Sequence, residues 1–285
     1  FYEMFFSDAE LASRELEITL TGRDCGMEER APMCGVPYHA AHTYISRLIA
    51  KGYKVAICEQ IEDPSTAKGI VKRDVTRVIT PGTVIDPAML EEKKNNYLMA
   101  IYCQQIYFGI AVVDVSTGEF YSTQITWGSS MRKLVDEISR YKPTEIIVNE
   151  ELTTRPEYKA YFKDYLKTDP SIIDREHFTL KNSQDKLIEV FNENPFSNLD
   201  LAQCASGALI TYLESTQKVD LKHIEKIRIY KIEQYMMLDS ASRRSLEITE
   251  TMRDGKKKGS LLWVLDKTST SMGGRKLRHW IEQPL

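Results

Sequence analysis

The chain has 285 residues, of which 42% are hydrophobic and 28% charged, and its formal net charge is −3. This composition is typical of a globular protein with a buried core, and the length predicts two or three domains. No apolar run approaches the roughly 18 residues that span a bilayer, which excludes a membrane-spanning helix, and the negative charge excludes binding to nucleic acid through a global positive field.

The chain begins with FYEMFFSDAELA, in which an aromatic pair stands first, without an initiator methionine. We therefore expect a fragment that starts inside a structural element. Asp8 is predicted to cap a helix with apolar residues at helical spacing, followed by a short strand near residue 20. Phe5 and Phe6 are assigned to the core.

The first segment, residues 1–88, is predicted to be mixed α/β. APMCGVPYHA, residues 31–40, contains two prolines and a glycine and is predicted to be loop or edge backbone. The elements expected after it are a helix over 41–53, a buried strand over 53–61 and another strand over 75–80.

A polar linker over 89–96 leads to a second segment, residues 97–218. Strand-like runs separated by short breaks predict antiparallel hairpins, over 96–103, 106–115 and 119–125. The next elements are an amphipathic helix over 129–141, an apolar strand over 144–149 and a long helix over 201–217. This order suggests a ribonuclease H-like layout.

The third segment, residues 219–285, starts with a strand-like run over 227–232 and is otherwise helical. Helices are expected over 238–252, with Asp239 as the cap, and over 260–268 and 271–285.

The five cysteines are odd in number and widely spaced, and no two form a C-x-x-C pair. They are predicted to be reduced, buried thiols of a cytosolic protein.

Several stretches closely resemble the MutS family of bacterial DNA mismatch repair proteins. They are FYEMFF, APMCGVPYHA and residues 55–86 in the first segment, and LDSASRRSLEIT and TSTSMGGRKLRHWIEQPL in the third. The resemblance covers essentially the whole chain in order. It implies an α/β multidomain fold, with a mixed α/β mismatch-recognition domain over 1–88, a linker over 89–96, a ribonuclease H-like connector domain over 97–218 and the truncated start of an all-α core or lever domain over 219–285.

Phe1-Tyr2-Glu3 matches the family's Phe-x-Glu recognition motif. By this resemblance, Phe1 stacks on a mispaired or unpaired base in the minor groove of kinked double-stranded DNA, and Glu3 contacts the edge of that base. Four further residues are candidate contacts to the DNA backbone: Arg23, Met33, Tyr38 and His39.

These residue types suit such a role. Stacking of a base on an aromatic ring is worth about 1–3 kcal/mol, and apolar wedges kink the duplex. Opening a base step costs least where the base is already mispaired. For Glu3, two hypotheses follow: the carboxyl takes up a proton in the dry groove and donates it to a base, or its repulsion penalises binding to correctly paired DNA.

The resemblance also implies partners outside these residues. They are a second protomer in a homodimer, a MutL-like repair partner on the connector, and ATP with Mg²⁺ in a downstream ATPase domain. The chain contains no G-x-x-x-x-G-K-[ST] motif, so the fragment itself is expected to have no catalytic site, cofactor or metal. The implied location is the bacterial cytoplasm, in association with the nucleoid and without a membrane partner.

Two alternatives remain open. The second segment could be a metal-dependent nuclease in which Asp114 binds a divalent cation with Glu119 or Glu145, although we favour a turn role for Asp114. The chain could also be a MutS paralogue specialised for recombination control, which Phe1 and Glu3 argue against.

Two further motifs have competing interpretations. His39-x-x-His42 has a spacing that allows metal binding, but the pair is better explained as histidines at a helix start. The lysines of DGKKKGS, residues 254–260, could contact phosphate, but a solvated loop is favoured.

Overall fold

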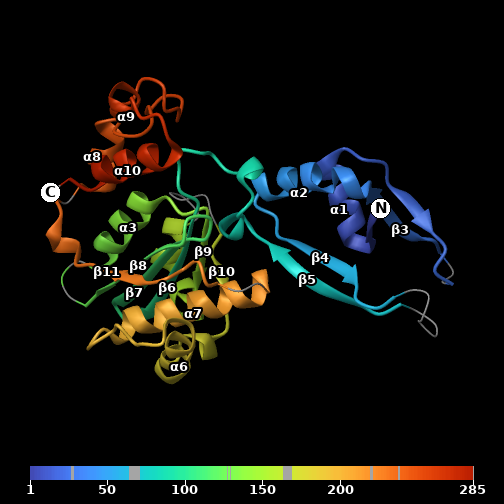
Figure 1. Ribbon diagram of the computed structural model, residues 1–285, viewed down its shortest axis with the longest axis horizontal. Helices are drawn as coiled ribbons and strands as arrows, with labels where there is room; N and C mark the ends of the chain where they lie inside the picture. Colours follow the sequence, from blue (N-terminus) through green and yellow to red (C-terminus); the bar gives the residue numbers. More distant parts are fainter. Residues whose placement is uncertain are drawn as a thin grey trace. The chain divides into compact units, whose positions relative to one another are not determined.

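The computed structural model describes residues 1–26, 29–63, 71–126, 128, 130–162, 169–218, 221–236 and 238–284. The chain forms two compact units, Phe1–Pro81 and Gly82–Leu285. Both units contain helices and strands, which confirms the predicted α/β class (Figure 1).

The first unit contains a three-stranded antiparallel sheet in the order β1-β3-β2 and a separate two-stranded ribbon of β4 and β5. Helix α1 covers one face of the sheet, where Ala9, Ala12 and Leu16 are buried with Cys34 of β3. The elements of this unit are β1 (Tyr2–Phe5), α1 (Phe6–Leu16), β2 (Thr21–Arg23), β3 (Ala31–Val36), the 3-10 turn η1 (Tyr38–Ala40), α2 (Ala41–Ala50), β4 (Val55–Gln60) and β5 (Arg73–Ile79).

The start of α1 differs from the prediction. The helix begins at Phe6, and Asp8 lies in its first turn, while no side chain caps the helix. Phe6 has a left-handed backbone with a φ of 54° at the turn from strand to helix. Its side chain is 52% exposed, because this turn directs the ring to solvent, and Phe5 is half-buried outside the core cluster beneath α1. The assignment of both residues to the core is therefore wrong.

The predicted loop over residues 31–40 is also wrong. Most of it is β3, the central strand, followed by η1. Pro32 lies opposite Gly22 of β2, one residue past the pairing of Phe5 with Met33, so the proline does not interrupt the ladder with β1. The glycine and the prolines therefore led to a wrong loop prediction, although a strand can accept a proline at this position.

Strand β4 is present but is not buried as predicted. Its side chains alternate between half-buried and exposed, because it pairs with β5 in a two-stranded ribbon among the residues that the structure describes. The prediction that all five cysteines are buried is wrong for two of them. Cys25 and Cys58 of the first unit are exposed, whereas Cys34, Cys103 and Cys204 are buried.

The second unit is built around a mixed six-stranded sheet in the order β10-β9-β6-β7-β8-β11. Strands β6, β7 and β8 form the predicted antiparallel hairpins, and β9 runs parallel to β6. The elements are β6 (Tyr97–Gln104), β7 (Tyr107–Asp114), β8 (Glu119–Ile125), α3 (Ser130–Tyr141), β9 (Glu145–Val148), α4 (Glu150–Thr154), α5 (Pro156–Tyr161), β10 (Ser171–Ile172), α6 (Leu180–Phe191), α7 (Asp200–Gln217), β11 (Ile227–Ile229), α8 (Ser240–Ser245), α9 (Leu261–Leu265) and α10 (Ser271–Glu282).

Both faces of this sheet are covered by helices. In β6, Met99 and Ile101 face a core completed by α3, α4 and α5, whereas Leu98 and Ala100 face a core completed by α6 and α7. Alternate residues of a strand point to opposite faces, which explains the division. Figure 1 shows α3 on one side of the sheet and α6 and α7 on the other.

Two glycines allow α7 to pack tightly. A Cβ atom on Gly109 of β7 would lie 1.9 Å from the carbonyl oxygen of Leu201, and one on Gly207 would lie 2.4 Å from the Cα of Ser183 in α6. The backbones therefore approach one another more closely than any side chain would permit. Among the described residues, α7 included, no helix has the length and apolar character needed to cross a membrane.

The third predicted segment starts with a strand that extends the sheet of the second. Strand β11 pairs in parallel with β8, with Arg228 opposite Tyr121. The helix predicted over 238–252 is confirmed only for α8, which ends at Ser245, and Asp239 caps it by accepting a hydrogen bond from the Ser242 amide. The residues that follow Ser245 form turns and bends, so the helix ends earlier than predicted.

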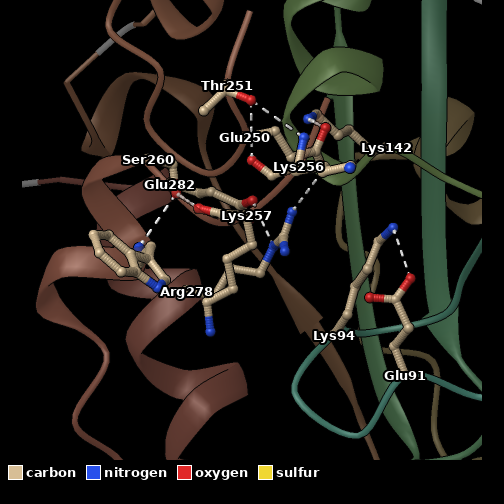
Figure 2. A network of polar contacts seen from close by, with 11 residues as sticks. Glu91, Lys94, Lys142, Glu250, Thr251, Lys256, Lys257, Ser260, Arg278 and Glu282 are labelled. Atoms are coloured by element: carbon tan, nitrogen blue, oxygen red, sulfur yellow. Dashed lines mark hydrogen bonds and ion pairs between the residues drawn. The ribbon is translucent and has the colours of Figure 1, made fainter. Parts of the chain in front are cut away.

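Ion pairs connect the end of α3 with the third segment (Figure 2). Lys142 Nζ lies 2.9 Å from Glu250 Oε2, and Arg278 of α10 lies 3.5 Å from Glu250 and 2.9 Å from Glu282. Glu250 therefore bridges a lysine next to α3 and an arginine of α10.

Candidate nucleic-acid interface

The alternation of β1 sorts its side chains between two faces of the three-stranded sheet. Met4 packs against the core beneath α1. Phe1, Glu3 and Phe5 alternate with it and belong to the opposite face, which α1 does not cover. The ring of Phe1 is 85% exposed, so it is not part of the core.

The other two strands add residues to the same face. Glu3 lies opposite Gly35, Phe5 opposite Met33, and Arg23 opposite Ala31, all at positions of the same parity along β3. We call this set the open face: Phe1, Glu3, Phe5, Arg23, Met33 and Gly35.

Glu3 and Arg23 form an ion pair on the open face. Arg23 Nη1 donates to Glu3 Oε2 over 2.6 Å, and the two side chains are 37% and 53% exposed for Glu3 and Arg23, respectively. The guanidinium also lies over the ring of Phe5, 5.9 Å from its centroid. A pair this exposed stabilises the fold by only about 0–1 kcal/mol, so stability alone does not explain its position.

Gly35 brings the two motif residues close to the sheet backbone. A Cβ atom at this position would lie 3.8 Å from both the Phe1 ring and Glu3 Cγ, and 3.3 Å from the Tyr2 carbonyl oxygen. Because Gly35 has no side chain, Phe1 and Glu3 share the space above it.

Tyr2, between the two motif residues, is anchored on the other side of β1. Its hydroxyl donates a hydrogen bond to Glu59 of β4, and its ring stacks on Tyr38 with centroids 5.6 Å apart. The hydrogen bond to Glu59, together with partial burial, raises the pKa of Tyr2 to about 12. Tyr2 therefore connects the strand that carries Phe1 and Glu3 to the ribbon.

A groove of about 780 Å³ lies within the first unit next to these residues. Four of the six predicted site residues line it: Phe1, Glu3, Arg23 and Tyr38. Met33 is half-buried on the open face but does not line the groove, and His39 is exposed on η1 without lining it. The groove thus offers aromatic rings and charges of both signs at an accessible surface.

Sequence reasoning missed Tyr2, Gly35 and Glu59. Tyr2 was treated only as the variable position of the motif, and Gly35 as a loop glycine. Strand alternation around Phe1 and Glu3 was the signal that could have assigned Tyr2 to the opposite face. Nothing in the sequence pairs it with Glu59, which is 57 residues away.

In the second unit, Asp114 is fully buried and has the predicted turn role. Its carboxylate accepts hydrogen bonds from the Ser116 amide and hydroxyl, the Asn96 amide and the Asn95 side chain. Of the two proposed co-ligands, Glu119 accepts a hydrogen bond from the same Asn95 side chain, whereas Glu145 accepts from Tyr212 and from the Gly82 amide. Nothing here supports the nuclease alternative.

No metal-binding group of three or more His, Cys, Asp and Glu side chains occurs among the residues that the structure describes. His39 and His42 lie at the start of α2, in η1 and the first turn of the helix. Lys257 of the DGKKKGS stretch forms an ion pair with Asp266 of the same segment.

Three family models match the chain in consecutive order. They are described as MutS domain I over residues 1–88, MutS domain II over 96–225 and MutS domain III over 241–285. Together they account for most of the chain, including both units.

Curated proteins named DNA mismatch repair protein MutS are similar over the whole chain. The one from Ruminiclostridium cellulolyticum is 63% identical, the one from Acetivibrio thermocellus 61% and the one from Alkaliphilus oremlandii 55%. In each case the match includes 100% of this chain and 33% of the relative. The chain therefore spans about one third of the length of the curated relatives it matches.

Proposed function

Because the chain belongs to the MutS family of DNA mismatch repair proteins, we propose that its first unit recognises mispaired or unpaired bases in double-stranded DNA. In this proposal, Phe1 stacks on the faulty base from the minor groove, and Glu3 contacts the edge of that base. Arg23, Met33, Tyr38 and His39 position the DNA backbone.

One observation carries the proposal: the Phe1 ring is 85% exposed on a face of the sheet that α1 leaves open. An exposed large apolar ring gains little for the fold, but it gains stacking energy once a base step opens beside it. Glu3 lies two residues away on the same face, within reach of the same base.

A mismatch can be selected because the duplex deforms more easily there than at correctly paired steps. Unstacking a step costs a few kcal/mol and costs least where pairing is already faulty, so an inserted ring discriminates without reading base identity. This explains how one aromatic side chain serves for many different mispairs. Phosphate contacts would add affinity, and Arg23 is the cation that the open face can offer to a phosphate.

The proposal extends to the rest of the longer protein. The division into domains over 1–88, 97–218 and 219–285, with a linker over 89–96, is part of it. We propose that the connector relays the state of the DNA to an ATPase domain that uses ATP and Mg²⁺, and that a MutL-like partner binds the connector. The chain itself contributes no catalytic site, and the protein works as a homodimer in the bacterial cytoplasm at the nucleoid.

The decisive experiment compares a duplex with one mismatch and its fully paired counterpart. Fluorescence anisotropy would be measured for this chain and for a chimera in which it replaces the matching third of the R. cellulolyticum protein. Phe1→Ala should weaken binding to the mismatched duplex about 5- to 150-fold, which corresponds to the loss of about 1–3 kcal/mol of stacking. Binding to the paired duplex should not change.

Phe6→Ala is the matched control. Phe6 is a second exposed phenylalanine of the same unit, at 52% exposure, but it lies in α1 and not on the open face. It should leave both affinities unchanged. A preference for the mismatched duplex that persists after Phe1→Ala would overturn the assignment of the wedge.

A further inference from the structure

The ion pair between Glu3 and Arg23 raises a conflict that rests on the proposed function. Arg23 Nη1 is 2.6 Å from Glu3 Oε2. If Glu3 is to contact a base edge, and Arg23 a phosphate, neither can keep the other as its partner.

The position of the pair shows that the fold does not depend on it. Glu3 belongs to β1 and Arg23 to β2, the two outer strands of the sheet, and both already pair through their backbones with β3. Within the described residues, neither side chain has a second ion-pair partner. The pair can therefore open without breaking the sheet.

Each side chain would have an alternative contact on opening. The guanidinium of Arg23 lies over the Phe5 ring, which can hold it on the open face when Glu3 leaves. Glu3 shares the space above Gly35 with Phe1, so a base that stacks on Phe1 would approach the carboxylate as well.

We propose that Arg23 is a specificity-determining residue that changes its partner when a faulty base is found. In the free protein and on correctly paired DNA, Arg23 neutralises Glu3, and the open face presents little net charge. At a mispair, Glu3 turns to the base and Arg23 binds a backbone phosphate. The specific complex thus contains one phosphate contact more than the search complex.

This exchange has a signature in the salt dependence of binding. Each phosphate that a cation neutralises contributes a slope of about −0.9 to log K against log salt. The slope for the mismatched duplex should therefore be steeper than that for the paired duplex by about 0.9. Between 50 and 200 mM salt, this corresponds to an additional loss of affinity of about threefold to fourfold.

Two substitutions should remove the difference in slope, one by changing the slope for the mismatched duplex and the other by changing the slope for the paired duplex. Arg23→Gln removes the additional phosphate contact, so the slope for the mismatched duplex falls to that of the paired duplex. Glu3→Gln releases Arg23 to bind phosphate on any DNA. The slope for the paired duplex should then become steeper by about 0.9, and its affinity should rise.

The experiment measures these slopes by anisotropy for the chain and the chimera, with Arg14→Gln as the control. Arg14, which is 72% exposed, forms an ion pair with Glu15 on α1, on the other face of the sheet, and its substitution should leave the difference in slope unchanged. Equal slopes for the two duplexes in the unsubstituted protein, or a difference that survives Arg23→Gln, would overturn the exchange. The proposed function fails separately, through a mismatch preference that survives Phe1→Ala.

Discussion

The two units of the chain use their residues in contrasting ways. The first unit has one small core, built from five buried residues of α1, β3 and α2, and leaves the other face of its sheet open. The second unit buries both faces of a six-stranded sheet under helices, with fully buried side chains such as Phe108, Leu98 and Met99.

This contrast follows from what each surface can be used for. A sheet face covered by a helix stabilises the fold but cannot contact a ligand, whereas an open face gives up that burial and stays accessible. We infer that the first unit exchanges stability for an interaction surface, and that the second unit provides a rigid body. Predictions about substitutions should therefore differ between the units.

The largest effect is expected where the second unit is packed most tightly. Gly109→Ala places a methyl group 1.9 Å from the carbonyl oxygen of Leu201, so the backbone of α7 or β7 must shift. We expect a loss of about 3 kcal/mol in the free energy of unfolding. Urea denaturation followed by tryptophan fluorescence measures it, because Trp263 and Trp280 belong to this unit.

Gly35→Ala is the matched substitution in the first unit. The nearest atom to the new methyl group is the Tyr2 carbonyl oxygen at 3.3 Å, and the other neighbours are at 3.8 Å. The cost should stay below about 1 kcal/mol, because the open face can adjust by a few tenths of an ångström. Because the first unit contains no tryptophan, tyrosine fluorescence follows its unfolding, and equal destabilisation by the two substitutions would contradict the distinction between a rigid and an adjustable unit.

The second unit was also the easier one to predict from sequence. The runs around Ile101, Val112 and Phe120 alternate or are continuously apolar, and short turns between them leave antiparallel hairpins as the natural solution. Helix α7 has a long, largely buried segment from Leu201 to Ile210. These are local signals, and the packing of both sheet faces agrees with them.

The first unit was harder because its elements depend on tertiary context. Pro32 and Gly35 indicate a loop, yet β3 is central because β1 and β2 supply its partners on both sides. The motif residues Phe1 and Glu3 could be recognised by resemblance alone. The pairing of Glu3 with Arg23 could not, because it joins outer strands whose register no local pattern specifies.

An intermediate effect is expected at His279, where α10 packs against the sheet of the second unit. Its ring stacks on Tyr121 with centroids 6.0 Å apart, and burial, followed by the charges of Lys276 and Arg140, lowers its pKa to about 4. An unfolded histidine titrates near 6.5. The unfolded chain thus takes up a proton first, and stability that is present above pH 6.5 is lost as the pH falls towards 4.

We expect this histidine to cost about 1 kcal/mol at pH 5 relative to pH 7, after allowance for its partial exposure. His279→Phe keeps an aromatic ring against Tyr121 and removes the titration. The measurement is the change in unfolding free energy between pH 7 and pH 5, compared between the substituted and unsubstituted chains, so that other groups cancel. If both chains lose the same stability, the protonation of His279 is not coupled to unfolding.

The smallest effect is expected at Tyr2, which anchors the strand of the wedge in the first unit. Tyr2→Phe keeps the stacking on Tyr38 but removes the hydrogen bond to Glu59, which should cost about 0.5–1 kcal/mol. The backbone amides of β1 should then exchange about twofold to fivefold faster, measured by hydrogen exchange and mass spectrometry. The same loss should occur in the unsubstituted chain as the pH rises from 10 towards about 12, where the phenol ionises.

Tyr44→Phe is the control, because Tyr44 packs on the small core and its hydroxyl has no hydrogen bond within the described residues. Faster exchange in β1 after Tyr44→Phe, or none after Tyr2→Phe, would mean that the ribbon does not hold the wedge strand in place.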